Sequence, residues 1–173
     1  MDLAKLIRDV PDFPVKGVLF KDITTLLKDS DAFLEAVDGL VDLIDQNVEE
    51  EIDLVAGIES RGFIFAAPLA YELRAGLIPI RKPGKLPSQK LSASYTLEYG
   101  TNTLEIHQDA IQPGQKVLLV DDLLATGGSA KAAAELIEKL GGSVVGMVFL
   151  IDLTFLKGVE KLQGYKVFSL LKF

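Results

Sequence analysis

Two adjacent acids, Asp121 and Asp122, stand between an apolar run and a loop of small residues, Ala-Thr-Gly-Gly-Ser. The apolar run at residues 117–120 is typical of a buried strand, and a helical pattern begins at Ser129. Backbone N–H groups in such a loop, at a helix N-terminus, can bind a phosphate. The acids would repel that phosphate, but they can accept hydrogen bonds from sugar hydroxyls or approach a bound Mg²⁺. The pattern predicts a ribose 5-phosphate site, although a capped helix after a buried strand would have the same sequence.

The apolar spacing along the chain predicts strands that alternate with helices. We expect helices at residues 3–10, 33–44, 63–74 and 129–140, and strands at residues 54–58, 77–80, 104–107, 117–121 and 144–151. Repeated strand–helix–strand units imply an α/β fold with a central, largely parallel sheet flanked by helices. Ligands of such sheets bind at the carboxyl ends of the strands. The small-residue loop and the glycine-bounded turn at residues 57–62 both lie there, which suits a ligand with two phosphorylated ends.

Length and composition describe one domain without a broad cationic surface. The 173 residues are 49% hydrophobic, which is enough apolar material for a single core. A net charge of −7 argues against nucleic-acid and anionic-membrane partners. Cysteine is absent, so disulfides and thiolate metal sites are excluded, and the composition suits a reducing compartment. With a charged N-terminus and no apolar stretch near the roughly 20 residues of a membrane helix, we expect a soluble, cytoplasmic protein.

The segment at residues 82–103 has little apolar periodicity and is rich in prolines, glycines and cations. We expect it to be a long, flexible loop, because insertions of this length in compact domains are commonly functional lids. The expected organisation is therefore a single domain over residues 1–173, with an N-terminal hood at about residues 1–30 and the lid loop at about residues 82–103.

Six blocks of sequence, in order, resemble the type I phosphoribosyltransferase family, and within it the members that use adenine. The blocks are residues 13–22, 57–63, 81–87, 95–100, 117–129 and 169–171. Together they cover nearly the whole chain from about Leu6 to Phe173. The resemblance implies a purine-salvage transferase that converts adenine and 5-phosphoribosyl 1-pyrophosphate (PRPP) to AMP and pyrophosphate. It also implies a homodimer and Mg²⁺ as cofactor, held mainly by PRPP and water without dedicated protein ligands.

The resemblance assigns the residues that bind PRPP. Those for the 5-phosphate and ribose are Asp121, Asp122, Ala125, Thr126, Gly127, Gly128 and Ser129. Those for pyrophosphate are Glu59, Ser60, Arg61, Arg81, Lys82 and Lys85. Without the resemblance, these exposed cations would be interpreted as a solvated loop and a surface ion pair.

The resemblance also assigns the residues near the purine. Adenine would contact Leu19, Phe20, Lys21 and Leu123, with Phe20 stacked on the ring and the backbone of Leu19 and Lys21 reading the 6-amino group. The catalytic set is Glu98, Tyr99, Asp121 and Asp122. Glu98 is the candidate acid near purine N7. This role needs a raised pKa of its carboxyl group, which lid closure would provide. Tyr99 would shield the reacting centre. A solvated lid acid is the alternative interpretation of Glu98.

Two positions depart from the family pattern. Glu59 stands where other members have Asp, and Lys21 stands where others have Arg, so side-chain roles there are less secure than backbone roles. The single histidine, His107, is expected to be structural rather than catalytic.

Three alternative functions differ in what they require of the sequence. A P-loop hydrolase is excluded, because Phe63 occupies the position of the lysine. A PRPP-binding regulator without turnover would need a basic nucleic-acid surface, which the chain lacks. A phosphoribosyltransferase for another base remains an alternative, which activity against adenine, 6-oxopurines and orotate would decide.

Overall fold

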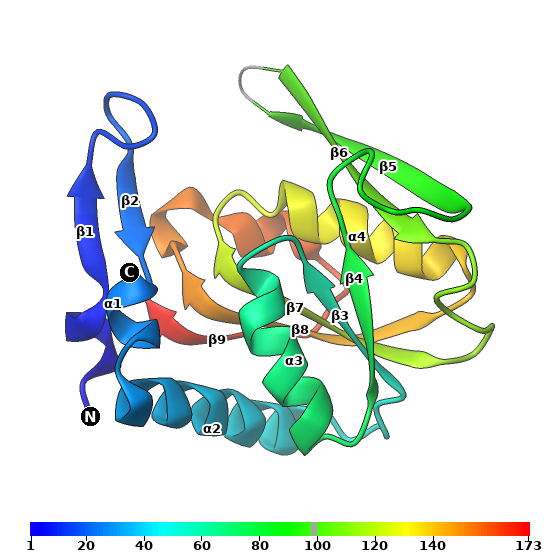
Figure 1. Ribbon diagram of the computed structural model, residues 1–173, viewed down its shortest axis with the longest axis horizontal. Helices are drawn as coiled ribbons and strands as arrows, with labels where there is room; N and C mark the ends of the chain where they lie inside the picture. The colour runs from blue at the N-terminus through cyan, green and yellow to red at the C-terminus, as the bar shows by residue number, and fades with distance from the viewer. Residues whose placement is uncertain (98–99) are drawn as a thin grey trace. The chain divides into compact units, whose positions relative to one another are not determined.

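The computed structural model describes residues 1–97 and 100–173. By its internal contacts the chain divides into two compact units, Met1–Gly39 and Leu40–Phe173. The second unit is built on a five-stranded, fully parallel sheet in the order β4-β3-β7-β8-β9 (Figure 1). Its strands are β3 (Leu54–Ile58), β4 (Gly76–Ile80), β7 (Lys116–Leu124), β8 (Ser143–Asp152) and β9 (Val167–Lys172). The predicted α/β fold with a parallel sheet is confirmed.

Helices cover both faces of this sheet. Side chains alternate along β3, so Gly57 faces α3 (Gly62–Glu72), where an added Cβ would lie 2.7 Å from the Ala66 Cβ. The next residue, Ile58, faces the other way into the core shared with α4 (Gly128–Lys139). These helices and the strands β3, β4, β7 and β8 fall close to their predicted positions. β9 was not predicted, because its side chains are half-buried and form no continuous apolar run.

The prediction that residues 82–103 form a loop without strands is wrong over most of their length, whereas their role as a lid stays a prediction. β5 (Lys90–Leu97) and β6 (Gly100–His107) form an antiparallel pair, which Figure 1 shows beside α4. Alternate residues, among them Ala93, Leu104 and Ile106, pack into the same core as α4. Pairing satisfies the backbone hydrogen bonds of the segment. Residues 91–97 read Leu-Ser-Ala-Ser-Tyr-Thr-Leu, an alternation of apolar and polar side chains that the loop prediction overlooked. Of the residues that the structure describes in this segment, those without strand or helix are residues 82–89.

The first unit contains η1 (Leu3–Leu6), β1 (Arg8–Pro11), β2 (Leu19–Asp22), α1 (Thr24–Leu27) and the beginning of α2 (Ser30–Asn47). The prediction of a helix at residues 3–10 is wrong beyond Leu6, because Arg8 to Pro11 pair antiparallel with β2. An ion pair of 2.6 Å between Arg8 Nη2 and Asp22 Oδ2 joins the two strands. Among the described residues, no helix is both long and apolar enough to cross a membrane.

Candidate functional site

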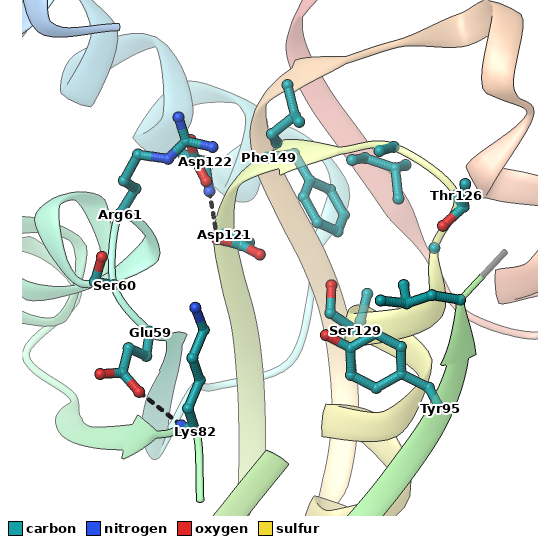
Figure 2. A pocket seen from close by; sticks show the side chains of 16 residues that line it. Glu59, Ser60, Arg61, Lys82, Tyr95, Asp121, Asp122, Thr126, Ser129 and Phe149 are labelled. Atoms are coloured by element: carbon teal, nitrogen blue, oxygen red, sulfur yellow. Dashed lines mark hydrogen bonds and ion pairs between the residues drawn. The ribbon is translucent and has the colours of Figure 1, made fainter. Parts of the chain in front are cut away.

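A cavity of about 360 Å³ opens at the carboxyl ends of β3, β7 and β8 in the second unit (Figure 2). It is lined by Glu59, Ser60, Arg61, Lys82, Tyr95, Leu97, Asp121, Asp122, Leu123, Leu124, Ala125, Thr126, Gly127, Ser129, Ala130 and Phe149. The turn after β3 and the loop after β7 therefore meet at one edge of the sheet, as the sequence predicts.

The loop after β7 is folded as a cradle at the start of α4. Gly127 is the N-cap residue, and its φ of 86° is a left-handed conformation that favours glycine. An added Cβ at Gly127 would also lie 2.6 Å from the carbonyl oxygen of Gly158. The hydroxyl residues Thr126 and Ser129 line the cavity on either side of this glycine. The positive end of a 12-residue helix and its unpaired N–H groups make this loop suitable for a phosphate.

The two acids lie within β7 rather than after it, because the strand continues to Leu124. The Asp122 N–H donates to Asp121 Oδ1 at 2.9 Å, and Arg61 Nε lies 2.9 Å from Asp122 Oδ2. Burial raises the pKa of Asp121 well above its usual range, and the negative charge of Asp122 raises it further. Burial also raises the pKa of Asp122, although Arg61 partly opposes that shift. The pair thus holds poorly solvated negative charge, which ligand hydroxyls would stabilise.

Close packing between α3 and β7 brings the turn after β3 to these acids. An added Cβ at Gly62 would lie 2.9 Å from Asp121 Oδ1 and 3.0 Å from the carbonyl oxygen of Val120. A side chain at Gly62 would therefore displace the Asp121 carboxylate or separate α3 from the strand. The glycine that ends the turn is what allows Arg61 to reach Asp122.

Glu59 organises the cations beside the cavity. Its Oε1 lies 3.0 Å from Arg81 Nη2 and 3.0 Å from Lys85 Nζ, and its Oε2 accepts the Lys82 N–H at 2.6 Å. Burial would raise the pKa of Glu59, but the Lys82 amide and the Lys85 and Arg81 side chains outweigh it and lower the pKa to about 2. Glu59 is therefore ionised throughout the neutral range.

In this structure the polar groups of Glu59 contact other parts of the protein, and its contact with pyrophosphate stays a prediction. Its N–H donates to the carbonyl oxygen of Ile80, and its carboxylate is taken up by cations, so neither group is offered to an anion. Lys82 extends its ammonium group into the cavity, between Glu59 and Asp121 (Figure 2). Arg81 and Lys85 do not line the cavity and are held behind it by Glu59.

The remaining predicted residues lie in three places. Gly128 begins α4 next to the lining residues, and Leu123 lines the cavity as predicted. Leu19, Phe20 and Lys21 lie on β2 in the first unit, where the ring of Phe20 packs edge-on against the ring of Phe13 with centroids 5.1 Å apart. Lys21 Nζ pairs with Asp9 Oδ1 at 2.7 Å. Glu98 and Tyr99 lie outside the described residues.

Tyr95 and Phe149 line the cavity without having been predicted. Phe149 lies opposite Asp121 in the register between β7 and β8, so a register count along the predicted strand at residues 144–151 could have found it. Tyr95 lies on β5, where its ring approaches Gly128 so closely that an added Cβ there would be 3.0 Å from Cδ2. The loop prediction for this segment removed the alternation that would have indicated Tyr95. His107 lies outside the lining, and its Nε2 accepts the Ser88 N–H at 3.4 Å.

Comparisons with known proteins agree on one family. A model of the phosphoribosyl transferase domain matches residues 24–169. The adenine phosphoribosyltransferase of Halothermothrix orenii is 61% identical over 172 residues, which cover 99% of each chain. The crystal structure of the adenine phosphoribosyltransferase from Thermoanaerobacter pseudethanolicus superposes with a TM-score of 0.96 at 53% identity, covering 99% of this chain and 98% of that chain. The Saccharomyces cerevisiae enzyme, crystallised with an imino-altritol bisphosphate and adenine, has a TM-score of 0.92 at 40% identity, covering 98% and 97%.

Proposed function

Because the chain belongs to the adenine phosphoribosyltransferases, which convert adenine and PRPP to AMP and pyrophosphate in purine salvage, we propose that its cavity is where this transfer takes place. The observation that carries the proposal is the meeting of three groups at one sheet edge. These groups are the cradle at residues 125–129, the acids Asp121 and Asp122, and the cations Arg61 and Lys82. They match in order the 5-phosphate, the ribose and the pyrophosphate of PRPP.

The cradle and the acids would bind the phosphoribosyl part of PRPP. Backbone N–H groups of residues 125–129 and the hydroxyls of Thr126 and Ser129 donate to the 5-phosphate. Asp121 and Asp122 accept hydrogen bonds from the ribose hydroxyls, which replace the solvation that burial removes. Both carboxylates then lie near the ribose ring as it acquires positive charge in an oxocarbenium-like transition state.

The cations would stabilise the leaving group. Negative charge accumulates on pyrophosphate as its bond to ribose C1 breaks, and fixed cations aimed at that charge lower the barrier. Lys82 reaches the cavity directly, and Arg61 lies at the same end, paired with Asp122. Ribose hydroxyls that bind Asp122 would compete for its oxygens and release Arg61 toward the pyrophosphate.

Mg²⁺ is the proposed cofactor. In the part of the chain that the structure describes, no three Asp, Glu, His or Cys side chains come together as a protein cage for a metal. The carboxylates of Asp121 and Asp122 line the cavity and supply the oxygen ligands that Mg²⁺ prefers, so they fit an ion that takes its other ligands from PRPP and water. When bound, the ion would neutralise charge on the departing pyrophosphate.

The purine would lie at the apolar end of the cavity, against Leu123 and Phe149. The proposed contacts from β2 are the backbone of Leu19 and Lys21, which distinguishes a 6-amino from a 6-oxo group, and the ring of Phe20. Glu98 is the proposed proton donor to N7, and Tyr99 the proposed shield of the reacting centre. These roles come from the family resemblance.

The homodimeric state and the cytoplasmic location remain predictions. In a homodimer, a second copy of the chain could cover exposed apolar side chains of the second unit near β4, which is the edge strand of the sheet. Leu77 of β4 and Tyr71 of α3 are exposed there by 50% and 81%.

Product formation tests the proposed function against its alternatives. With PRPP and Mg²⁺, adenine should yield AMP and pyrophosphate, whereas hypoxanthine, guanine and orotate should yield little nucleotide. AMP can be followed by chromatography, and pyrophosphate by a coupled assay. Turnover with another base would reassign the specificity. PRPP binding without any pyrophosphate release would instead indicate a regulator.

Substitution in the cradle should weaken PRPP binding selectively. Valine at Gly128 would place branched carbons against Tyr95, because even a Cβ there lies 3.0 Å from the ring, and valine at Thr126 removes a hydroxyl donor. We expect each variant to raise the KM for PRPP by roughly tenfold or more, the scale of one lost hydrogen bond to a charged group. The matched variant Thr154→Val, outside the cavity lining, should retain the parent KM. Unchanged PRPP affinity in both cradle variants would reject the phosphate assignment.

A further inference from the structure

Glu105 is a buried acid that the proposed mechanism does not use. It lies on β6, is 4% exposed, and does not line the cavity. Burying a carboxylate is costly unless it is well hydrogen-bonded, so its partners indicate what it does. Its contacts with Arg81, Gly84, Lys90 and Ser92 all fall within residues 81–92, next to the cations of the site.

The backbone of Glu105 forms a two-way bridge with Arg81. The Arg81 N–H donates to the Glu105 carbonyl oxygen at 2.9 Å, and the Glu105 N–H donates to the Arg81 carbonyl oxygen at 2.7 Å. Three residues further on, the Gly84 N–H donates to Glu105 Oε1 at 2.7 Å. Glu105, on the antiparallel β5–β6 pair (here called the β5–β6 ribbon), therefore holds both Arg81 and Gly84, the two ends of the turn that contains Lys82.

The other carboxylate oxygen of Glu105 makes weaker contacts. Its Oε2 lies 3.5 Å from Ser92 Oγ and 4.0 Å from Lys90 Nζ. The short contact is thus to a neutral backbone amide, and the cation is at the limit of an ion pair. The contact with the Gly84 N–H therefore depends on an acceptor oxygen at the end of a side chain as long as that of Glu105. The negative charge of the carboxylate is less important for it.

Glu59, from a different element, holds the same segment. It accepts the Lys82 N–H at 2.6 Å, whereas Glu105 accepts the Gly84 N–H two residues later. Glu59 comes from the turn after β3, and Glu105 from the β5–β6 ribbon. Lys82, whose amide is the first of these two attachments, is the member of the segment that lines the cavity.

We propose that Glu105 is a positioning residue for the pyrophosphate end of the site: by accepting the Gly84 N–H it fixes the segment at residues 81–85, so that Lys82 enters the cavity. The proposal rests on the proposed function in one respect, the assignment of Lys82 to pyrophosphate. It adds that Glu105, on the β5–β6 ribbon, determines the position of the Lys82 side chain.

Three substitutions at Glu105 separate its length from its charge. Glu105→Gln keeps an acceptor oxygen at the same reach, Glu105→Asp keeps the charge but falls one methylene short, and Glu105→Ala removes both. We expect Ala and Asp to raise the KM for PRPP by up to roughly tenfold, the upper range for the loss of one hydrogen bond. Gln should restore the parent KM to within about twofold. The KM for adenine and kcat should change little, because a displaced cation that binds PRPP and the transition state alike affects KM.

A merely structural role would give a different pattern. A general loss of stability would lower the active fraction, and hence kcat, without a selective change in the KM for PRPP. Ser94→Ala is the matched control, because it removes a 2.9 Å contact with Thr103 on the same ribbon that does not involve residues 81–85. Circular dichroism checks the fold of each variant. If Ala does not fold, the contrast between Asp and Gln decides the question.

The variant Lys82→Ala distinguishes a wrong pyrophosphate assignment of Lys82 from a wrong positioning role of Glu105. If Glu105 acts through Lys82, the Glu105→Ala/Lys82→Ala double variant should have the PRPP KM of Lys82→Ala alone, whereas independent effects would multiply. An unchanged KM in Lys82→Ala would reject the proposed pyrophosphate assignment. A raised KM in Lys82→Ala with a normal KM in Glu105→Ala, rescue by Asp but not Gln, or multiplied effects would each overturn the role of Glu105.

Discussion

Asp121→Asn should remove most of the turnover and, at neutral pH, make the ligand-free protein more stable. Asparagine keeps the Oδ1 that accepts the Asp122 N–H, so the local fold should survive. It cannot offer a charged acceptor to the ribose or stabilise positive charge on the ring. We expect kcat/KM to fall by roughly 10² to 10³, as when a preorganised electrostatic group is lost from an active site.

The stability change follows from the pKa of Asp121, which burial and the neighbouring Asp122 raise above its value in the unfolded chain. In the folded state the carboxyl therefore keeps its proton to higher pH than in the unfolded state. Its contribution to stability is fully present below the unfolded pKa and is lost as pH rises through the folded pKa. At neutral pH, which is above the unfolded pKa, the raised pKa of the folded state therefore costs stability, and asparagine, which does not titrate, avoids that cost.

Thermal melts across the range from about pH 4 to about pH 8 check this sign. The melting temperature of Asp121→Asn should exceed that of the parent at the upper end, and the difference should shrink toward the lower end. Asp109→Asn, at an exposed aspartate outside the cavity lining, should change neither activity nor the melting curve. A variant that unfolds, or that retains full turnover, would show that Asp121 serves the fold and not the ligand.

The parts of the site that could be predicted from the sequence are formed by short, continuous segments of the chain. Residues 117–129 and 57–62 combine a buried strand with a glycine-bearing turn, and the carboxyl ends of parallel strands meet at one edge for any such fold. Both turns were therefore predicted at the cavity, with Asp121, Asp122 and Arg61 in it. Local sequence was sufficient because each turn carries its own chemistry.

The parts that were missed depend on pairing between distant segments. Residues 91–97 alternate apolar and polar side chains, but their pairing with residues 100–107 and their packing against α4 depend on contacts that the local sequence does not specify. The same pairing places Tyr95 on the cavity and Glu105 on the 81–85 segment. An acid such as Glu59 also has no local signal of its task, because its partners Arg81 and Lys85 lie more than twenty residues away.

Glu98→Gln should affect the chemical step, in contrast to the variants of Glu105. Glu98 belongs to the family block Tyr-Thr-Leu-Glu-Tyr-Gly and is the candidate acid for purine N7. Glutamine has nearly the same shape but cannot transfer a proton. We expect kcat and kcat/KM to fall together by roughly 10² to 10⁴, the usual range for general acid–base catalysis, with little change in the KM values.

Steady-state kinetics with adenine and PRPP, each varied at saturating levels of the other, separates these effects. A selective rise in the KM for PRPP would place Glu98 with the pyrophosphate contacts, because it would mean that the residue binds the ground state and the transition state alike. Near-parental kcat would leave Glu98 as a solvated acid, and N7 would then take its proton from water or another group. Glu160→Gln, at an exposed position outside the cavity lining, controls for the loss of one negative charge. Loss of kcat in Glu98→Gln alone would therefore identify proton transfer, and not charge, as its contribution.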